Sequence, residues 1–390
     1  MSTSLWGPLA ERFETERPRK ILALDGGGIR GVLTLEVLAE IERQLAAATG
    51  RGDAFRLCDF FDYVGGTSTG AILAAGIARG MSVGELLEFY VEAGPLMFQK
   101  EKLLSRLRNF YTAEPLKEKL QAVFGAGTTL EPEHLKTLLL VVTRNATTDS
   151  PWPVTSNPHA RYNAAARKDC NLRIPLWQLV RASTAAPIFF PPEVLAWDAA
   201  DPEKTFIFVD GGITPYNNPA FLLYRLATVP EYRLGWPTGE RRLMIVSVGT
   251  GSAPTVGGDV LSPGKNVVSN LAGLPGALMY GAQVDQDINC RAVGRCVSGD
   301  PIDRELGDMI PRDAAGRPIS PDEDLGRAFL YARFDADLSA GGLAKLDLDH
   351  IAPDRVQTLD AVESIPELRA IGGAVARKVD LARQFAPFFA

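Results

Sequence analysis

The sequence predicts an α/β protein with three layers, in which helices cover both faces of a mostly parallel central sheet. The apolar run at residues 20–24 ends in Asp-Gly-Gly-Gly, as a buried parallel strand commonly does. From Val32 onward the apolar residues recur at intervals of three and four, which is the spacing of one helical face. Strand-like and helix-like segments then keep alternating, and this alternation is typical of a parallel sheet covered by helices.

The remaining elements follow from the same patterns. Strands are predicted at 62–64, 136–143, 206–209, 243–248 and 329–334, and helices at 71–77 and 175–185. Proline occupies the first turn of the last helix, where its missing N–H costs nothing. Residues 298–325 are rich in proline, aspartate and glycine and are predicted to form a loop, and helices are expected from residue 335 to the end.

Composition restricts the class of protein. The 390 residues include 46% apolar and 23% charged side chains, as globular domains do on average. A formal charge of −6 argues against a nucleic-acid partner. The first residues lack the apolar segment of a secretory signal, and no apolar run approaches the ~18 residues that span a bilayer. We therefore expect a cytoplasmic protein, with reduced cysteines at positions 58, 170, 290 and 296.

Three regions are expected along the chain. Residues 1–19 form an N-terminal extension, residues 20–255 a core with all the motifs described below, and residues 256–390 a C-terminal elaboration. The elaboration keeps apolar residues at helical spacing, as in Val356 and Leu359, so we expect it to pack on the core. A separate small domain is the alternative to such packing, and regulation through a bound ligand is the alternative to a purely structural role.

Residues 66–70, Gly-Thr-Ser-Thr-Gly, match the nucleophile-elbow pattern Gly-x-Ser-x-Gly. A strand that turns sharply into a helix forces the turn residue into a strained conformation, and glycines such as Gly66 and Gly70 avoid the clashes. The Ser68 hydroxyl would then stand near a helix N-terminus, which favours negative charge. The segment lies between a predicted strand and a predicted helix, which favours a nucleophile over an ordinary glycine-rich turn.

A second glycine-rich segment, Asp-Gly-Gly-Gly-Ile-Arg-Gly, follows the first strand. Its glycines leave N–H groups free to converge on an anion, and Arg30 adds positive charge. The anion could be the oxyanion of an acyl-transfer intermediate. It could also be a dinucleotide pyrophosphate, because Gly26, Gly28 and Gly31 match Gly-x-Gly-x-x-Gly. That alternative needs an acidic residue at the end of the second strand, whereas the nearest candidate, Asp53, lies in a predicted turn.

Asp210 follows the apolar strand 206–209 and precedes two more glycines, Gly211 and Gly212. A carboxylate at the C-terminal end of a sheet strand points into the crevice where α/β proteins place their sites. Apolar surroundings would raise its pKa above the ordinary ~3.9 and make it a better proton acceptor from a serine hydroxyl. Because Asp-Gly-Gly alone is usually a turn, this interpretation depends on the other two motifs.

These elements, in this order, resemble the patatin-like phospholipase family, over roughly residues 20–250. The resemblance rests on Asp25–Gly31, Gly66–Gly70 and Asp210–Gly212, and extends to residues 176–187, 190–192 and Asn218-Pro219. It implies a Ser68 nucleophile with Asp210 as its general base, a dyad in place of a triad. The groups it implies for oxyanion stabilisation are the loop residues Gly26, Gly27 and Gly28, together with Arg30.

The resemblance also implies substrate and partners. It implies hydrolysis of carboxylic esters in glycerophospholipids or other lipid esters, transient contact with a membrane surface, and no cofactor. Two apolar segments, residues 186–192 and 95–98, are expected as turns that either border the crevice and admit acyl chains or serve as buried anchors. Related bacterial proteins include toxins and nucleotide-activated antiphage effectors, so a small-molecule activator and a role in antiviral defence are further expectations.

Three histidines occur in the chain, at positions 134, 159 and 350. An α/β-hydrolase triad needs Ser, Asp and His in that chain order, which Ser68, Asp210 and His350 satisfy. The dyad is preferred because His350 lies in a poorly patterned region and the glycine segment lacks the His-Gly sequence such hydrolases use. No His, Cys, Asp and Glu cluster has metal-ligand spacing, so no metal is expected.

Overall fold

The computed structural model describes residues 5–97, 114–187, 189–197, 201–252 and 267–389, and these build a nine-stranded sheet. The strand order is β5-β6-β3-β2-β1-β7-β9-β8, and β4 pairs with β3 off this path. The strands are β1 (Arg19–Leu24), β2 (Tyr63–Thr67), β3 (Leu138–Asn145), β4 (Ser150–Thr155), β5 (Glu193–Ala196), β6 (Thr205–Asp210), β7 (Leu243–Val248), β8 (Arg295–Ser298) and β9 (Leu330–Phe334).

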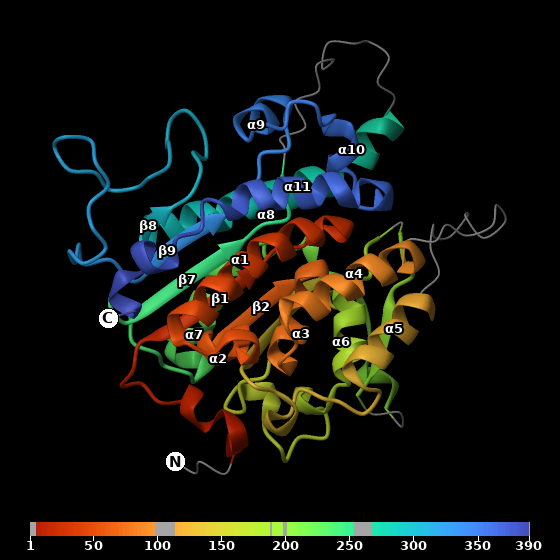
Figure 1. The fold of residues 1–390 in the computed structure, drawn as a ribbon. Helices are drawn as coiled ribbons and strands as arrows, with labels where there is room; N and C mark the ends of the chain where they lie inside the picture. The colour runs from red at the N-terminus through yellow and green to blue at the C-terminus, as the bar shows by residue number, and fades with distance from the viewer. Residues whose placement is uncertain (1–4, 98–113, 188, 198–200, 253–266, 390) are drawn as a thin grey trace.

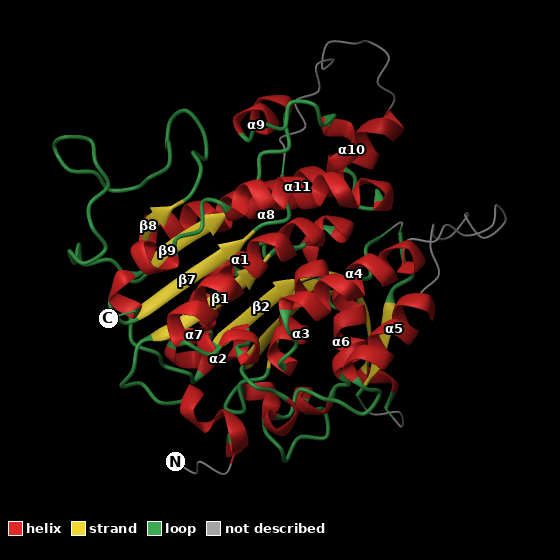
Figure 2. Cartoon of the chain, viewed as in Figure 1, coloured by secondary structure: helices red, strands yellow, loops and turns green. Residues whose placement is uncertain are grey.

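Helices cover both faces of this sheet, as Figures 1 and 2 show. α1, α3 and α11 lie on one face, and α7 and α8 on the other. The helices are α1 (Gly31–Thr49), α2 (Leu57–Phe60), α3 (Thr69–Arg79), α4 (Val83–Met97), α5 (Glu114–Phe124), α6 (Leu176–Ser183), α7 (Ala220–Thr228), α8 (Val267–Val293), α9 (Ala340–Lys345), α10 (Pro353–Gln357), α11 (Ile365–Ala376) and α12 (Leu381–Gln384). The predicted three-layer α/β/α class is confirmed.

The middle of the sheet is parallel, and antiparallel pairs are confined to one side. β1 pairs in parallel with β2 and β7, β2 with β3, and β7 with β9. β3, in contrast, pairs antiparallel with β4 and β6. Three strands were not predicted from the sequence. β4 contains two prolines, which are tolerated because it is an edge strand, and β5 and β8 are only four residues long.

β2 and β6 lie end to end along the same edge of β3. Val142 of β3 pairs with Thr67, the last residue of β2, and the next residue, Thr143, pairs with Asp210, the last of β6. The other edge of β3 is occupied here by β4. Two strands that run toward each other therefore end at adjoining positions. Asp210 ends a strand, as expected. This strand runs antiparallel to β3, however, so it is not one of the parallel strands of the sheet.

The residues after 266 extend the same sheet and both helical layers, with α8 on one face and α11 on the other. β9 lies beyond β7, and β8 beyond β9. α11 packs on α1, with Ile371 fully buried and Gly372 so close that a Cβ there would lie 2.6 Å from the Leu33 carbonyl oxygen. The loop predicted at 298–325 is present, with no helix or strand between Ser298 and Leu330. The expected boundary at residue 255 lies outside the described residues.

Three smaller expectations can be compared with the structure. All four cysteines are buried and free, as predicted. The turn predicted at residues 95–98 is wrong as far as Met97, because α4 continues through Pro95 in its last turn, while Phe98 lies outside the described residues. Among the described helices, none is both long and apolar enough to cross a bilayer.

α11 should contribute to the cooperative stability of the whole fold. Ile371→Ala removes a fully buried side chain and should lower the free energy of unfolding in urea by about 2–5 kcal/mol. Arg369→Ala on the same helix is the control, because its ion pair with Glu36 of α1 is half exposed and such pairs contribute about 0–1 kcal/mol. If the two variants lose equally little, α11 is not part of the cooperative unit.

Candidate active site

Ser68 occupies the sharp turn between β2 and α3. Its backbone angles, φ 54° and ψ −121°, are strained for any residue with a side chain. Close contacts explain the glycines on either side: a Cβ at Gly66 would lie 2.0 Å from the Gly70 oxygen, and one at Gly70 would lie 2.2 Å from the Leu24 oxygen. The strained turn predicted from the glycine spacing is therefore present.

Ser68 and Asp210 are joined by a direct hydrogen bond. The Ser68 Oγ donates to Asp210 Oδ2 at 2.6 Å, and the two residues are 8% and 5% exposed. The other carboxylate oxygen, Oδ1, accepts the Gly212 N–H at 2.6 Å, while Gly211 lies against the carbonyl of β3 residue Val142. Both oxygens of Asp210 are thus held, and one of them is held by the serine hydroxyl.

Burial changes the acidity of Asp210. Loss of hydration raises the pKa of this carboxyl to about 6. The hydrogen bonds from Ser68 and the Gly212 amide, and the positive charge of Arg181, act against this rise because they stabilise the ionised form. The carboxylate is therefore ionised at neutral pH, with a pKa near the range in which a group exchanges protons efficiently.

The apolar segment at residues 186–192 lies next to Asp210. The Asp210 N–H donates to the Ala185 oxygen at 2.9 Å, and Arg181 Nη2 donates to the Pro191 oxygen at 2.8 Å. Phe190 is buried and Pro192 is exposed, while residue 188 lies outside the described part of the chain. The segment is thus held close to the carboxylate through the preceding residue, Ala185, and through Pro191.

The glycine-rich loop lies across the end of β1, directly beside Ser68. A Cβ at Gly26 would come within 3.2 Å of the Ser68 Cβ. Gly28 has a φ of 61°, and a Cβ there would lie 2.2 Å from the Leu359 oxygen, so the position requires glycine. The N–H groups of Gly27 and Gly28 donate to no other described residue. These two amides are therefore the N–H groups of the loop that could bind an anion.

Gly26 and Arg30, the other two predicted oxyanion groups, make hydrogen bonds to other parts of the chain. The Gly26 N–H donates to the Asn217 oxygen at 3.1 Å. Arg30 Nε donates to the Gly27 oxygen at 3.3 Å, and its Nη1 to the Gln357 oxygen at 3.4 Å. The geometry therefore does not support Gly26 as a donor. Arg30 links the Gly27 carbonyl of the loop to the end of α10 and adds positive charge nearby.

Three buried polar residues support the site without having been assigned a role from the sequence. Ser183 Oγ accepts the Ser68 N–H at 2.9 Å and donates to a β3 carbonyl at 2.6 Å. Thr250 Oγ1 donates to the Gly26 oxygen at 2.9 Å, while the backbone oxygen of Asn217 accepts the N–H of the same residue. Ser183 lies in the segment 176–187 singled out above, and Thr250 lies between two glycines after a strand. Asn217 itself belonged to none of the motifs identified in the sequence.

The geometry disfavours both alternative sites. Ser68 donates directly to Asp210, so no imidazole lies between them, and His350 is exposed. Asp53 lies in a 3-10 turn, Gly52–Ala54, and not at the end of β2, so a dinucleotide would lack its acidic ribose ligand. Within the described residues, no group of three or more His, Cys, Asp or Glu side chains could hold a metal.

The raised pKa of Asp210 has a consequence for stability. Because the folded-state pKa of about 6 exceeds the ordinary 3.8, the folded chain binds this proton more tightly than the unfolded chain does. The resulting stabilisation is complete below about pH 4 and is lost as the pH rises through about 6. Asp210→Asn should therefore be more stable than the wild type at ~pH 7.5, by on the order of 1–3 kcal/mol in urea unfolding, with a smaller difference toward ~pH 4. Lower stability of the variant at ~pH 7.5 would contradict the raised pKa.

Comparison with known proteins agrees with the motifs. A family model described as patatin-like phospholipase matches residues 22–224, just over half of the chain. Patatin-T5 of Solanum tuberosum is 29% identical over 247 residues, 60% of this chain and 60% of that protein. The cGAMP-activated phospholipases of Escherichia coli and Vibrio cholerae are 30% and 32% identical, over 60% and 52% of this chain and 63% and 56% of their own lengths.

The chain thus spans less than two thirds of the length of these three relatives. Among solved structures, VipD from Legionella pneumophila is similar at a TM-score of 0.35 and 13% identity, over 90% of this chain and 67% of that one. The chain belongs to the patatin-like phospholipase family.

Proposed function

We propose that this chain is a serine hydrolase of the phospholipase A type, which cleaves carboxylic esters of glycerophospholipids and releases fatty acid. The observation that carries the proposal is the direct Ser68–Asp210 hydrogen bond of 2.6 Å at a strained elbow. Nucleophile and base within hydrogen-bond distance form the minimum unit of nucleophilic catalysis. Membership of the patatin-like phospholipase family supports the lipid ester as substrate.

Acylation begins with proton transfer from Ser68 to Asp210. As Oγ bonds to the carbonyl carbon, the carboxylate takes its proton and the carbonyl oxygen becomes an oxyanion. The free amides of Gly27 and Gly28 are the donors proposed for this oxyanion. When the tetrahedral intermediate collapses, the ester C–O bond breaks, and the leaving alkoxide takes the proton from Asp210 and departs as lysophospholipid.

Deacylation repeats these steps with water. Asp210 takes a proton from the water as its oxygen attacks the acyl carbon on Ser68. Collapse of the second intermediate breaks the bond between acyl carbon and Oγ, and Oγ recovers the proton from Asp210. The fatty acid leaves and the Ser68–Asp210 pair is restored. One carboxylate therefore serves both half-reactions, and no histidine is needed.

We further propose that the enzyme acts at a membrane surface. The hairpin of β5 and β6, which ends at Asp210, carries two exposed apolar residues paired across its strands, Val194 and Ile207. They are 54% and 45% exposed. Apolar side chains on the segment that delivers the base would bring the site to the lipid from which it takes its substrate.

Regulation by a small-molecule activator is a second part of the proposal. It is supported by about 30% identity to the cGAMP-activated phospholipases of two bacteria. A lipid hydrolase that degrades membranes needs such control, and membrane degradation on a signal would suit a role in defence against phage.

Ser68→Ala and Asp210→Asn should each abolish measurable fatty-acid release from mixed phospholipid vesicles. The double variant should be no worse than either single one, because the pair acts as a unit. His350→Ala is the control, and its rate should stay within a few-fold of the wild type. A loss on the order of 10⁴-fold in the folded control would instead indicate a triad.

The glycine loop should be intolerant of a side chain at Gly27. A Cβ there would lie 2.1 Å from Thr250 Oγ1, so Gly27→Ala must move the loop and its amides. Losing one oxyanion donor typically lowers kcat ~10²–10³-fold. Gly373→Ala on α11, where a Cβ meets open space, is the matched control. Full activity of folded Gly27→Ala would refute this assignment, and NAD binding that Gly28→Val removes would favour the dinucleotide alternative.

A further inference from the structure

The glycine loop starts at a wholly buried carboxylate, Asp25, whose partners come from the far end of the chain. Arg333 of β9 donates to both of its oxygens, from Nη1 to Oδ1 at 2.9 Å and from Nη2 to Oδ2 at 2.6 Å. Gln283 of α8 adds a third bond, from Nε2 to Oδ2 at 3.0 Å. A bidentate guanidinium–carboxylate pair fixes orientation as well as distance. Asp25 is therefore held in one position.

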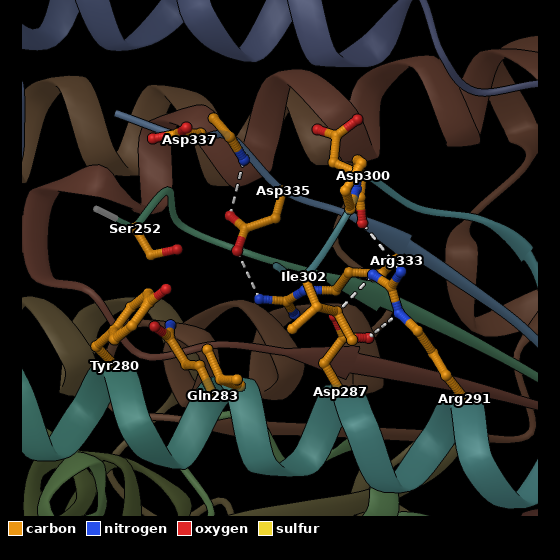
Figure 3. Close-up of a pocket in the computed structure, with 13 residues that line it drawn as sticks. Ser252, Tyr280, Gln283, Asp287, Arg291, Asp300, Ile302, Arg333, Asp335 and Asp337 are labelled. Atoms are coloured by element: carbon orange, nitrogen blue, oxygen red, sulfur yellow. Dashed lines mark hydrogen bonds and ion pairs between the residues drawn. The ribbon is translucent and has the colours of Figure 1, made fainter. Parts of the chain in front are cut away.

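Arg333 is itself held from two sides. Its Nη1 also donates to Ser247 Oγ of β7 at 2.8 Å, and its Nη2 to Asp335 Oδ2 at 2.7 Å. Asp335 in turn accepts the Gly251 N–H at 2.8 Å through its other oxygen. Figure 3 shows Arg333 and Asp335 at the wall of a cavity of about 200 Å³, facing Gln283 on α8. Arg333 and Asp335 are thus held by several hydrogen bonds, and on one side they border the cavity.

The loop is anchored at both ends, in addition to the hydrogen bonds of Gly26 and of the Gly27 carbonyl described above. Asp25 anchors the first end, and at the second the Ile29 N–H donates to the Leu359 oxygen at 2.9 Å. Gly27 and Gly28, which carry the free amides, lie between these anchors and have no side chains with which to pack. Because Asp25 lies only two residues before Gly27, a displacement of its side chain and backbone would strain the segment whose amides must stay aligned with an oxyanion.

We propose that Arg333, assisted by Gln283, is a positioning residue for the oxyanion loop, so that the C-terminal part of the chain completes a site whose reacting groups lie elsewhere. The inference deepens the proposed function and rests on it. Burial raises the pKa of Asp25 to about 6, and Arg333 opposes that rise. Without Arg333 the buried carboxyl would take up a proton or turn away from its present position, and either change would shift the loop.

The test compares Arg333→Met with Arg291→Met in the full-length protein. Arg291 is a similarly buried arginine that lines the same cavity. Its Nε and Nη2 donate to the two oxygens of Asp287 at 2.9 and 2.7 Å, and among the described residues it makes no hydrogen bond to Asp25. Arg333→Met should lower kcat toward a short-chain p-nitrophenyl ester about 10²-fold with little change in KM, as expected of a displacement of about 1 Å. Arg333→Lys should recover part of this loss, and Arg291→Met should stay within a few-fold of the wild type.

A second readout separates positioning from general stability. Affinity for a trifluoromethyl ketone, which Ser68 converts into a tetrahedral oxyanion adduct, should fall in proportion to kcat/KM across the Arg333 variants. A merely structural role would lower the amount of folded protein and leave the affinity of the folded fraction unchanged, which would overturn the proposal. Equal losses in Arg291→Met would overturn it as well.

A third measurement needs no activity. The Gly26 and Ile29 amides are both hydrogen-bonded and should exchange with deuterium faster in Arg333→Met than in Arg291→Met. If the protein hydrolyses no ester through Ser68, the proposed function fails, and the exchange rates still decide whether Arg333 holds the loop. Unchanged exchange and unchanged kcat in Arg333→Met would show that it does not.

Discussion

The site depends on one constraint: β2 and β6 run toward each other along the same edge of β3 and end at neighbouring positions. This meeting brings Ser68 and Asp210 within 2.6 Å although 142 residues separate them in the chain. β3 holds both ends through backbone hydrogen bonds, so the distance between hydroxyl and carboxylate is set by the sheet. In the proposed mechanism, a pair fixed in this way needs no intermediate histidine to align it.

Several features of the site oppose stability, and the surrounding structure compensates for them. Ser68 has a strained backbone, Asp210 is a carboxylate buried almost completely, and a short loop of glycines carries two amides that donate to none of the residues the structure describes. Each is held by buried polar contacts, from Ser183, from the Gly212 amide and, in our proposal, from Arg333 through Asp25. Strain and unpaired groups at one place are typical of a site prepared for charge that develops during a reaction.

The sequence predicted those features whose causes are local. Gly66 and Gly70 indicated the elbow because steric clash acts over a few residues, and strand–helix alternation indicated the fold class. The direction of β6, the use of the Gly26 amide by Asn217 and the pair between Asp25 and Arg333 were not predictable in this way. Arg333 lies 308 residues from Asp25, and a contact across such a separation leaves no pattern in either segment.

The central claim is that Ser68 is acylated with Asp210 as its only base. Rapid acid quenching of the enzyme during turnover of a phospholipid, followed by peptide mass spectrometry, tests it most directly. We expect an acyl mass on the peptide that contains Ser68 in the wild type and in His350→Ala, and none in Asp210→Asn. An acyl group on any other residue, or undiminished acylation of Ser68 in Asp210→Asn, would contradict it.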